Sequence, residues 1–363
     1  MKLLVDIGHP AHVHLFRFMA EDLRNEGWEI LFSLREKDHS SDIARSLGFD
    51  LACYGKTRKT LIGKALSYFQ KTFKLFLIAR QFKPDITISH SSFYLSQVSW
   101  LLGIPNLTLE DTGNTEQILL YLPFTSAVLT STSYHREHGR KQIRYKAFHE
   151  LAYLHPGHYE RLFGRDILNR KSNPRPVILI RLVNWSASHD LNRKGIDPSW
   201  VEEIILRFSA DCQIMLSAEG EAGEMFHELL IPGGKVNIHT LLSGIDLYVG
   251  EGATMASECA MMGIPAIYLN PIPAGTIDEQ SKYGLVYHLT GKQEIIRLIE
   301  RLTSDPLATA REHQQKARKL LADRINLSEF LCWFVKEWPS SFEIMKREPD
   351  YQDRFLISGQ STL

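Results

Sequence analysis

The stretch Leu247–Pro271, LYVGEGATMASECAMMGIPAIYLNP, is the most informative segment of this 363-residue chain. Its apolar start, Leu247–Val249, predicts a buried strand that runs into Gly250 and Gly252. Two glycines allow a tight turn and let a ligand approach the backbone closely. Thr254 is a candidate N-cap for the helix that follows. Because such a helix start presents free N–H groups and a partial positive charge, the stretch predicts a phosphate site.

Glu258 falls one turn into the predicted helix, from where its carboxylate could reach the ribose hydroxyls of a nucleotide. The plainer alternative is that the glycines only join strand to helix and that Glu258 is solvated. The pattern differs from G-x-G-x-x-G and from the Walker loop, since no lysine follows the glycines. This difference argues against a Rossmann dehydrogenase and against a P-loop nucleoside triphosphatase.

Short apolar strands alternate with amphipathic helices on both sides of this stretch. We expect strands at Lys2–Ile7, Glu29–Ser33, Ile86–Ser89, Asn106–Leu109, Ala127–Thr130, Val177–Val183, Gln213–Ser217, Lys235–Ile238, Leu247–Val249 and Ala266–Leu269. We expect helices at His12–Glu26, Ser40–Leu47, Leu61–Phe82, Phe93–Leu102, Ser199–Ser209, Ala222–Leu230 and Met255–Met262. The repeated strand–helix–strand pattern predicts parallel, doubly wound sheets.

A polar, proline-containing segment, Arg165–Pro176, interrupts the alternation and predicts a linker. We therefore expect two Rossmann-like domains, residues 1–165 and 176–335, and a C-terminal helix and tail at 336–363 that could pack back on the first domain. Ligands bind such folds at the carboxyl ends of the strands. The predicted site is thus a central cleft that the two domains face.

The composition excludes several classes of protein. Lys plus Arg and Asp plus Glu both total 42, so the chain lacks the positive field of a general nucleic-acid binder. The four cysteines have no C-x-x-C spacing, which is typical of reduced thiols in the cytosol. No 18 apolar residues run together, and a predicted strand begins almost at the N-terminus. We expect a cytoplasmic protein, at most peripheral at the inner face of the plasma membrane.

The pattern Gly-x-Gly-x-Thr-Met-x-x-Glu-x-x-x-x-Gly-x-Pro, from Gly250 to Pro265, resembles the nucleotide-sugar signature of GT-B enzymes. These enzymes include the peptidoglycan N-acetylglucosaminyltransferase and the UDP-N-acetylglucosamine 2-epimerases. From Met1 to Thr290 the chain is similar to an uncharacterised family, domain of unknown function 354, through DIGHPAHVHLFRF, KPDITIS, LGIPNLTLEDTGNT, HELAYLHP and GATMASECAMMGIPA. The resemblance implies a GT-B-like fold and a nucleotide-sugar substrate, with UDP as the expected carrier and no cofactor.

The resemblance also implies roles for the residues of the glycine turn. Thr254 and the Gly252–Ala253 backbone would hold phosphate, and Glu258 would hold the ribose. The chain departs from the family at Ala253, where a second glycine is usual, and this departure makes the phosphate turn more crowded.

The first predicted strand is followed by three histidines, His9, His12 and His14. His12 opens a helix, and Trp28 follows sixteen residues later, a layout similar to that of the peptidoglycan transferase. On this resemblance His12 faces the cleft, where an imidazole could accept the proton of an acceptor hydroxyl or steady a diphosphate. His9 and His14 more simply cap the turn and pack on the helix. No second cluster stands at metal-ligand spacing, so we expect no metal.

Other candidate side chains follow predicted strands. Glu110 and Asp111 could supply a base or bind sugar hydroxyls, and the epimerases have a similar strand-end glutamate; alternatively Asp111 only helps to form a turn. Arg181 could pair with a diphosphate. Besides Asp111, four residues could line the cleft: His9, His189, Glu219 and Gln280.

The segment Leu51–Pro84 has 34 residues with eight Lys or Arg and no Asp or Glu. Within it a predicted helix has an apolar stripe at Leu61, Ala65, Phe69, Phe73, Phe76 and Leu77, and basic residues on its other side at Lys64, Lys71 and Lys74. The ordinary interpretation is a surface helix that packs on the first sheet through this stripe. The sharper one is contact of residues 56–83 with an anionic membrane, which would suit a lipid-linked acceptor.

The leading hypothesis is a metal-independent glycosyltransferase of cell-surface polysaccharide or glycolipid assembly, with a sugar or lipid-linked acceptor. His12 or Glu110 would be the base, and Arg181 and the turn at Gly250 would hold the diphosphate. Two alternatives stay open: a nucleotide-sugar epimerase or hydrolase that uses Glu110 and His189, and a nucleotide-sugar-binding protein without chemistry.

Overall fold

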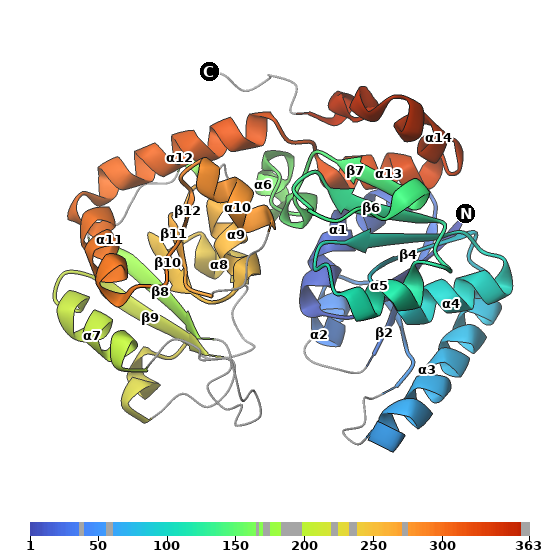
Figure 1. The fold of residues 1–363 in the computed structure, drawn as a ribbon, viewed down its shortest axis with the longest axis horizontal. Helices are drawn as coiled ribbons and strands as arrows, with labels where there is room; N and C mark the ends of the chain where they lie inside the picture. The colour runs from blue at the N-terminus through green and yellow to red at the C-terminus, as the bar shows by residue number, and fades with distance from the viewer. Residues whose placement is uncertain are drawn as a thin grey trace. The chain divides into compact units, whose positions relative to one another are not determined.

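The computed structural model describes residues 1–35, 40–55, 61–164, 167–169, 175–182, 198–218, 224–231, 238–270 and 275–356. The chain forms two compact units (Figure 1). The first unit contains Met1–Tyr153 and the chain from Arg324 onward, and the second contains Leu154–Asp323. Each unit is built on one parallel sheet, so the predicted doubly wound α/β class is confirmed.

The first unit has a seven-stranded sheet in the order β3-β2-β1-β4-β5-β6-β7. Its strands are β1 (Lys2–Ile7), β2 (Glu29–Leu34), β3 (Asp50–Cys53), β4 (Ile86–His90), β5 (Asn106–Glu110), β6 (Ala127–Ser131) and β7 (Gln142–Tyr145). From β1 the chain winds outward through β2 and β3, then returns to β4 on the other side of β1. The strand order therefore reverses between β1 and β4, which is where open α/β sheets bind ligands.

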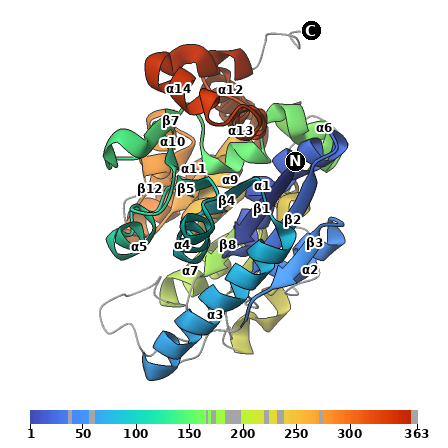
Figure 2. The same cartoon turned by 90° about the vertical axis from the view of Figure 1, so that its right-hand side faces the viewer.

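Helices cover both faces of this sheet (Figure 2). On one face lie α1 (Pro10–Asn25), α2 (Ser40–Ser46) and α13 (Leu327–Lys336), with α13 packed on α1. On the other face α3 (Leu61–Phe82), α4 (Phe93–Leu102) and α5 (Thr115–Tyr121) pack side by side. The central strands are buried on both sides, which explains their nearly continuous apolar sequences.

The second unit has a five-stranded sheet in the order β12-β11-β10-β8-β9. Its strands are β8 (Val177–Leu182), β9 (Gln213–Ala218), β10 (Leu247–Gly250), β11 (Ala266–Tyr268) and β12 (Val286–His288). Helices α7 (Pro198–Phe208) and α11 (Lys292–Ser304) share a hydrophobic core with the sheet. The other helices of this unit are α6 (Tyr159–Phe163), α8 (Ile238–Leu242), α9 (Ala253–Met261), α10 (Gly275–Lys282) and α12 (Pro306–Ala322). Here the strand order reverses between β8 and β10.

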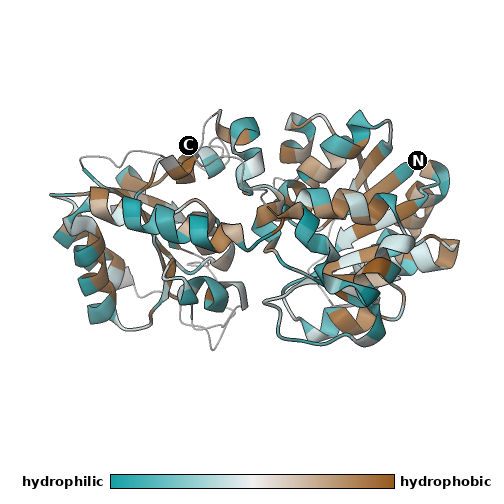
Figure 3. Cartoon of the chain, turned by 90° about the horizontal axis from the view of Figure 1, so that it is seen from above, coloured by the Kyte–Doolittle hydropathy of each residue, from teal (hydrophilic) through white to brown (hydrophobic). Residues whose placement is uncertain are grey.

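Shorter elements complete the chain. Helix α14 spans Ser340–Arg347, and 3-10 helices lie at Gly139–Lys141, His149–Ala152, Pro156–His158, Ile167–Asn169, Glu224–Leu229 and Pro349–Phe355. In Figure 3 the strands are mostly brown and many helices alternate between teal and brown, as expected for buried sheets under amphipathic helices.

Several sequence expectations differ from the structure. The division of the chain falls at Tyr153 and Asp323, so the expected linker Arg165–Pro176 begins beyond the first break, and α13 belongs to the first unit. The expected strand Lys235–Ile238 lies mostly outside the described residues, and Ile238 begins α8 instead. The expected helix Ala222–Leu230 is a 3-10 helix where it is described. Finally, the edge strands β3, β7 and β12 were not expected.

The expectation that an apolar stripe packs α3 on the sheet is wrong for three residues of that stripe, which are exposed instead. Phe69, Phe73 and Leu77 are 69%, 62% and 47% exposed. From Ser67 onward, where the side chains of this helix are described, the buried residues are instead Ser67, Lys71, Leu75 and Ala79.

Candidate functional site

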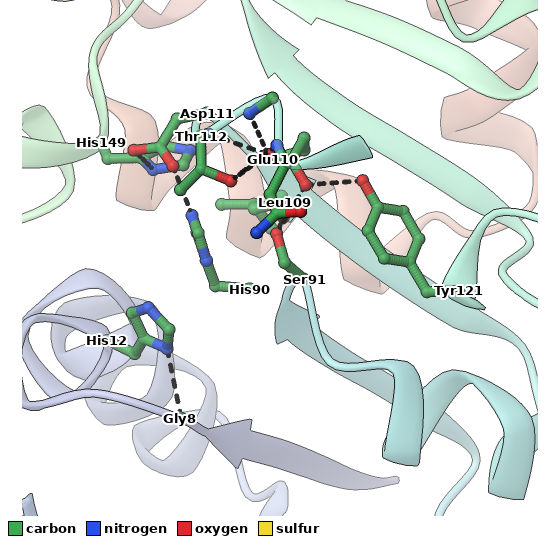
Figure 4. Close-up of polar contacts among 12 residues, drawn as sticks. Gly8, His12, His90, Ser91, Leu109, Glu110, Asp111, Thr112, Tyr121 and His149 are labelled. Carbon is green, nitrogen blue, oxygen red and sulfur yellow. Dashed lines mark hydrogen bonds and ion pairs between the residues drawn. The ribbon is translucent and has the colours of Figure 1, made fainter. Parts of the chain in front are cut away.

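The turn between β1 and α1 holds two of the histidines singled out in the sequence. His9 is the N-cap of α1, and its Nδ1 accepts the N–H of Ala11 at 3.2 Å, so its expected capping role is confirmed. His12 Nδ1 accepts the backbone N–H of Gly8 at 3.2 Å (Figure 4). Burial and the neighbouring rings of His90 and His9 hold the pKa of His12 well below its ordinary value. The ring is thus neutral near pH 7, with its proton on Nε2.

The ends of β4 and β5 bring a histidine and a carboxylate beside His12. The rings of His12 and His90 lie 4.4 Å apart between centroids. Asp111 lies between two imidazoles: its Oδ1 is 2.8 Å from His90 Nε2, and its Oδ2 is 3.0 Å from His149 Nδ1 (Figure 4). His12 follows β1 and His90 ends β4, and these two strands are paired in the sheet, so this cluster sits where the strand order reverses.

The charges in this cluster reinforce one another. Burial alone would raise the pKa of Asp111, but His149 and His90 outweigh it and hold that pKa well below the usual range. Burial would lower the pKa of His90, yet Asp111 raises it above the ordinary value. The pairing thus favours the carboxylate form of Asp111 and the imidazolium form of His90.

Glu110 is fully buried and accepts five hydrogen bonds. Its Oε1 accepts from the backbone N–H and hydroxyl of Thr112 and from the N–H of Gly113, each at 2.8 Å. Its Oε2 accepts from Ser91 Oγ at 2.7 Å and Tyr121 OH at 2.6 Å. Burial would raise the pKa of Glu110, but the neighbouring imidazole and these donors lower it. The expectation that Glu110 is a base stays a prediction, and its contacts favour a role in shaping the turn after β5.

The chain between β4 and α4 is also held in an unusual conformation. Ser91 has a φ of 50°, a left-handed value that costs a non-glycine residue about 1–3 kcal/mol. Its hydroxyl is one of the donors to Glu110, which holds the residue in place. Ser92, the N-cap of α4, donates its hydroxyl to buried Asp6 at the end of β1. Backbone strain of this kind concentrates at functional sites. Here the hydrogen bonds of Ser91 and Ser92 hold the strained segment, and with it His90, in place.

The second unit contains the glycine turn. β10 ends at Gly250, and α9 begins at Ala253 with Gly252 as its N-cap. The expectation that Thr254 is the N-cap is wrong, because the helix starts two residues earlier. The N-cap residue Gly252 has no side chain to cap α9, and the first backbone N–H groups of a helix have no partner within the helix itself. A Cβ on Gly250 would lie 2.7 Å from the backbone oxygen of Arg181, so only glycine fits there.

Two charged groups stand beside this turn. Arg181 pairs with Gly250 across β8 and β10, where the order of this sheet reverses, and its guanidinium donates to Ser217 Oγ. Glu258 is 5% exposed, so it is not solvated, and its Oε1 lies 3.2 Å from His239 Nε2. The residues expected to hold a nucleotide diphosphate thus lie on elements that meet within the second unit: Arg181, Gly250, Gly252, Ala253, Thr254 and Glu258.

The remaining expected residues have different outcomes. His189 and Glu219 lie outside the described residues, so their roles stay predictions. Gln280 on α10 is fully buried and donates to Ser257 Oγ of α9 at 2.7 Å, which packs the two helices together. Its Oε1 has no hydrogen-bond partner within the described ranges.

One group among the described residues has the composition of a metal site. The ligand atoms of His90, Asp111 and His149 all lie within 4.8 Å of one another. Each imidazole already hydrogen-bonds a different oxygen of Asp111, so these contacts explain why the three side chains lie together without a metal ion. The expectation of no metal stays a prediction.

Sequence reasoning missed His90 and His149. His90 ends a strand that was expected as Ile86–Ser89, so one more residue would have placed it at the carboxyl edge. His149 follows β7, an edge strand that was not expected; it opens the quoted motif HELAYLHP, but nothing in that motif places it beside Asp111.

Comparisons with known proteins agree with this architecture. A family model described as "Protein of unknown function (DUF354)" matches residues 1–328. An uncharacterised protein of Methanocaldococcus jannaschii is 26% identical over 315 residues, which cover 83% of this chain and 91% of that protein.

Solved structures resemble the whole chain at low identity. S. aureus MnaA in a co-structure with UDP has a TM-score of 0.67 at 13% identity, and the alignment covers 94% of this chain and 97% of the MnaA chain. The UDP-GlcNAc 2-epimerase of Neisseria meningitidis bound to UDP-GlcNAc has a TM-score of 0.60 at 13% identity, covering 89% and 99%. Acinetobacter baumannii MurG has a TM-score of 0.59 at 12% identity, covering 93% and 99%. These likenesses show the fold alone, and the expected GT-B-like fold is confirmed.

Proposed function

Since the chain belongs to the DUF354 family and has a GT-B-like fold, we propose that it is a glycosyltransferase that uses a nucleotide-diphosphate sugar. The acceptor is a sugar or a lipid-linked sugar of cell-surface polysaccharide or glycolipid assembly. The observation that carries the proposal is the cluster of His12, His90 and Asp111 at the strand-order reversal of the first unit.

The second unit holds the diphosphate of the donor. The uncapped start of α9 supplies N–H groups and the positive end of a helix dipole, and Arg181 adds a guanidinium at the neighbouring strand end. Glu258 accepts hydrogen bonds from the ribose hydroxyls. These groups stabilise the negative charge of the departing diphosphate, which is the main electrostatic demand of the reaction. The solved relatives that carry UDP or UDP-GlcNAc support this donor class.

The first unit handles the proton of the acceptor. His12 accepts a hydrogen bond at Nδ1, so its Nε2 donates one; it therefore steadies a substrate oxygen. Asp111, which is 43% exposed, accepts a hydrogen bond from the acceptor hydroxyl and orients it, and because the pKa of Asp111 is depressed, the proton passes on to solvent as the glycosidic bond forms. His90 and His149 hold the two carboxylate oxygens in position.

A second candidate is a nucleotide-sugar epimerase or hydrolase. The observation in its favour is a cluster of three titratable side chains whose polar atoms lie close together: His90, Asp111 and His149. An epimerase must both remove a proton and return one, and such a cluster offers groups for both steps. Epimerases are also among the structural relatives.

One assay separates the candidates. The purified protein is incubated in EDTA with UDP-N-acetylglucosamine, and then with GDP-, CDP- and TDP-linked sugars, each with and without sugar acceptors. Release of nucleoside diphosphate that requires the acceptor supports the glycosyltransferase. An isomerised or free sugar without acceptor supports the second candidate. If calorimetry detects no binding of any nucleotide sugar or nucleotide, both are refuted.

A further inference from the structure

Large apolar side chains are exposed on three consecutive helices of the first unit. Among the described residues, ten large hydrophobic side chains are exposed, and seven of them lie on α3, α4 and α5. They are Phe69, Phe73 and Leu77 of α3, Trp100 and Leu101 of α4, and Leu119 and Leu120 of α5. Scattered exposed apolar residues are ordinary, but a concentration on one layer marks a binding surface.

The three helices form one layer (Figure 2). α4 packs against both of the others. Tyr68 of α3 donates its hydroxyl to Gln97 of α4, and Gln97 Nε2 donates to the backbone oxygen of Leu120 in α5 at 3.1 Å. The exposed side chains therefore belong to neighbouring helices that are fixed to one another. We call the outer side of this layer the α3–α5 face.

The orientation of α3 follows from its packing. Its buried residues recur every four positions, from Ser67 to Ala79. Phe69, Phe73 and Leu77 each lie two positions after a buried residue, which is about 200° around the helix axis. A rotation of α3 that buried Phe69, Phe73 and Leu77 would expose the residues from Ser67 to Ala79 that are now buried. These three apolar side chains therefore face away from the sheet.

The charges beside these rings are positive. Helix α3 contains no acidic residue, and from Ser67 onward, where its side chains are described, its exposed charged residues are Lys74 and Arg80; exposed Lys83 follows it. Helix α4 has no charged residue, and α5 has one, Glu116. Aromatic and aliphatic side chains beside basic residues suit the boundary between acyl chains and anionic headgroups.

We propose that the α3–α5 face docks on an anionic lipid bilayer. Phe69, Phe73 and Trp100 would enter the headgroup layer, while Lys74 and Arg80 pair with lipid phosphates. A second copy of the chain fits less well, because a two-fold contact at α3 would set its basic residues against each other with no carboxylate on that helix. No helix in the described ranges is long and apolar enough to cross a bilayer, so docking uses side chains alone. This proposal concerns membrane binding and does not depend on the proposed glycosyltransferase reaction.

Flotation with lipid vesicles tests the proposal. We expect the protein to float with vesicles of phosphatidylcholine plus phosphatidylglycerol, to stay behind with phosphatidylcholine alone, and to be released by salt. The double variant Lys74→Glu/Arg80→Glu is expected to lower partitioning more than tenfold, because both cations that pair with lipid phosphates are replaced by anions. Phe69→Ser/Phe73→Ser is expected to lower it at least tenfold with the charges intact.

Leu206→Ser is the matched control, because Leu206 is also exposed, at 82%, but lies on α7 of the second unit. It should float like the unchanged protein, and thermal unfolding should confirm that every variant folds. Equal binding to both vesicle types, or binding to neither, overturns the proposal. So does a dimer in light scattering that Phe73→Ser dissociates. Turnover with a soluble acceptor should survive the α3 changes, so an inactive protein that still floats refutes only the proposed reaction.

Discussion

At the scale of single residues, His12 shows how a backbone contact decides what a side chain can do. Its Nδ1 is occupied by the N–H of Gly8, so the neutral ring can only donate from Nε2. Burial beside His90 disfavours the imidazolium, so the ring stays neutral. The hydrogen bond thus argues against the first of the two roles considered for His12, proton removal, and favours a ring that donates a hydrogen bond to a substrate oxygen.

His12→Ala is expected to lower kcat by about 10²–10³-fold, as loss of a donor to a developing charge does, and to change nucleotide affinity by less than about threefold. Steady-state kinetics with the active sugar pair, together with calorimetry on the nucleotide, measures both quantities. His135→Ala, at an exposed histidine of the same unit, is the control and should behave as the unchanged protein. Equal kcat in the two variants would remove His12 from the reaction.

The pairing of Asp111 with His90 gives stability a defined pH dependence. The pKa of Asp111 is depressed on folding, so its contribution is present above its ordinary pKa and disappears as the pH falls through the folded value. The pKa of His90 is raised, so its contribution is full below about pH 6.5 and disappears as the pH rises through the folded value. The pair therefore stabilises most between about pH 4 and 6.5.

Asp111→Asn is expected to lower the free energy of unfolding by about 1 kcal/mol at pH 6, a value reduced for the exposure of the carboxylate, and by less at pH 9. Urea unfolding of the variant and the unchanged protein at both pH values measures the difference. Asp50→Asn, at an exposed position of edge strand β3, should show no such pH dependence. A loss of the same size at both pH values would contradict the charge pairing.

At the scale of elements, the turn from β10 to α9 combines two requirements. Gly250 must have no side chain, because the end of β8 and the Tyr248 hydroxyl fill the space beside it. Gly252 is the N-cap of α9 and supplies no side-chain oxygen to its first N–H groups, as the proposed phosphate site requires. Sequence reasoning found this turn because glycine spacing is a local signal; it misplaced the cap because Thr254 is an equally good N-cap by residue type.

Gly250→Ala is expected to lower the free energy of unfolding by about 1–3 kcal/mol, since its Cβ would meet backbone that cannot move aside. Gly252→Ala is the matched control: its Cβ would lie 3.2 Å from the Tyr248 hydroxyl, which can shift, so we expect a loss below about 1 kcal/mol. Urea unfolding compares the two. Equal losses would mean that the close approach of β8 is not what constrains this turn.

The same scale shows why other elements were harder to predict. Central strands such as β1 and β5 are apolar along their length because helices cover both of their faces. The edge strands β3, β7 and β12 have three or four residues and include polar ones, so nothing local distinguishes them from loops. His149 depends on β7 for its position, which is why its place beside Asp111 could not be predicted. Phe69 and Phe73 match a packing stripe by period, and only the structure shows that the sheet uses a different one.

At the scale of the whole molecule, the first unit is made from both ends of the chain. Phe330 and Phe334 of α13 are fully buried in it, and Ser328 Oγ donates to the backbone oxygen of Ala152. Lys146 Nζ lies within 2.8 Å of Asp350 and Asp353. Periodicity predicts such a helix, but it does not say which sheet the helix will cover, so the boundary near residue 335 was misplaced.

The second unit is consequently an insertion within the first, and this imposes an order on synthesis. A ribosome delivers all of Leu154–Asp323 before it delivers α13, so the later-numbered unit should be able to mature while the earlier one still waits for its last helix. Nascent chains stalled just after Asp323 has left the exit tunnel should resist protease within the inserted unit but be cut near α1, and release of α13 should end that cutting. Protection of α1 in the stalled chain would show that the N-terminal strands mature without their distant partner.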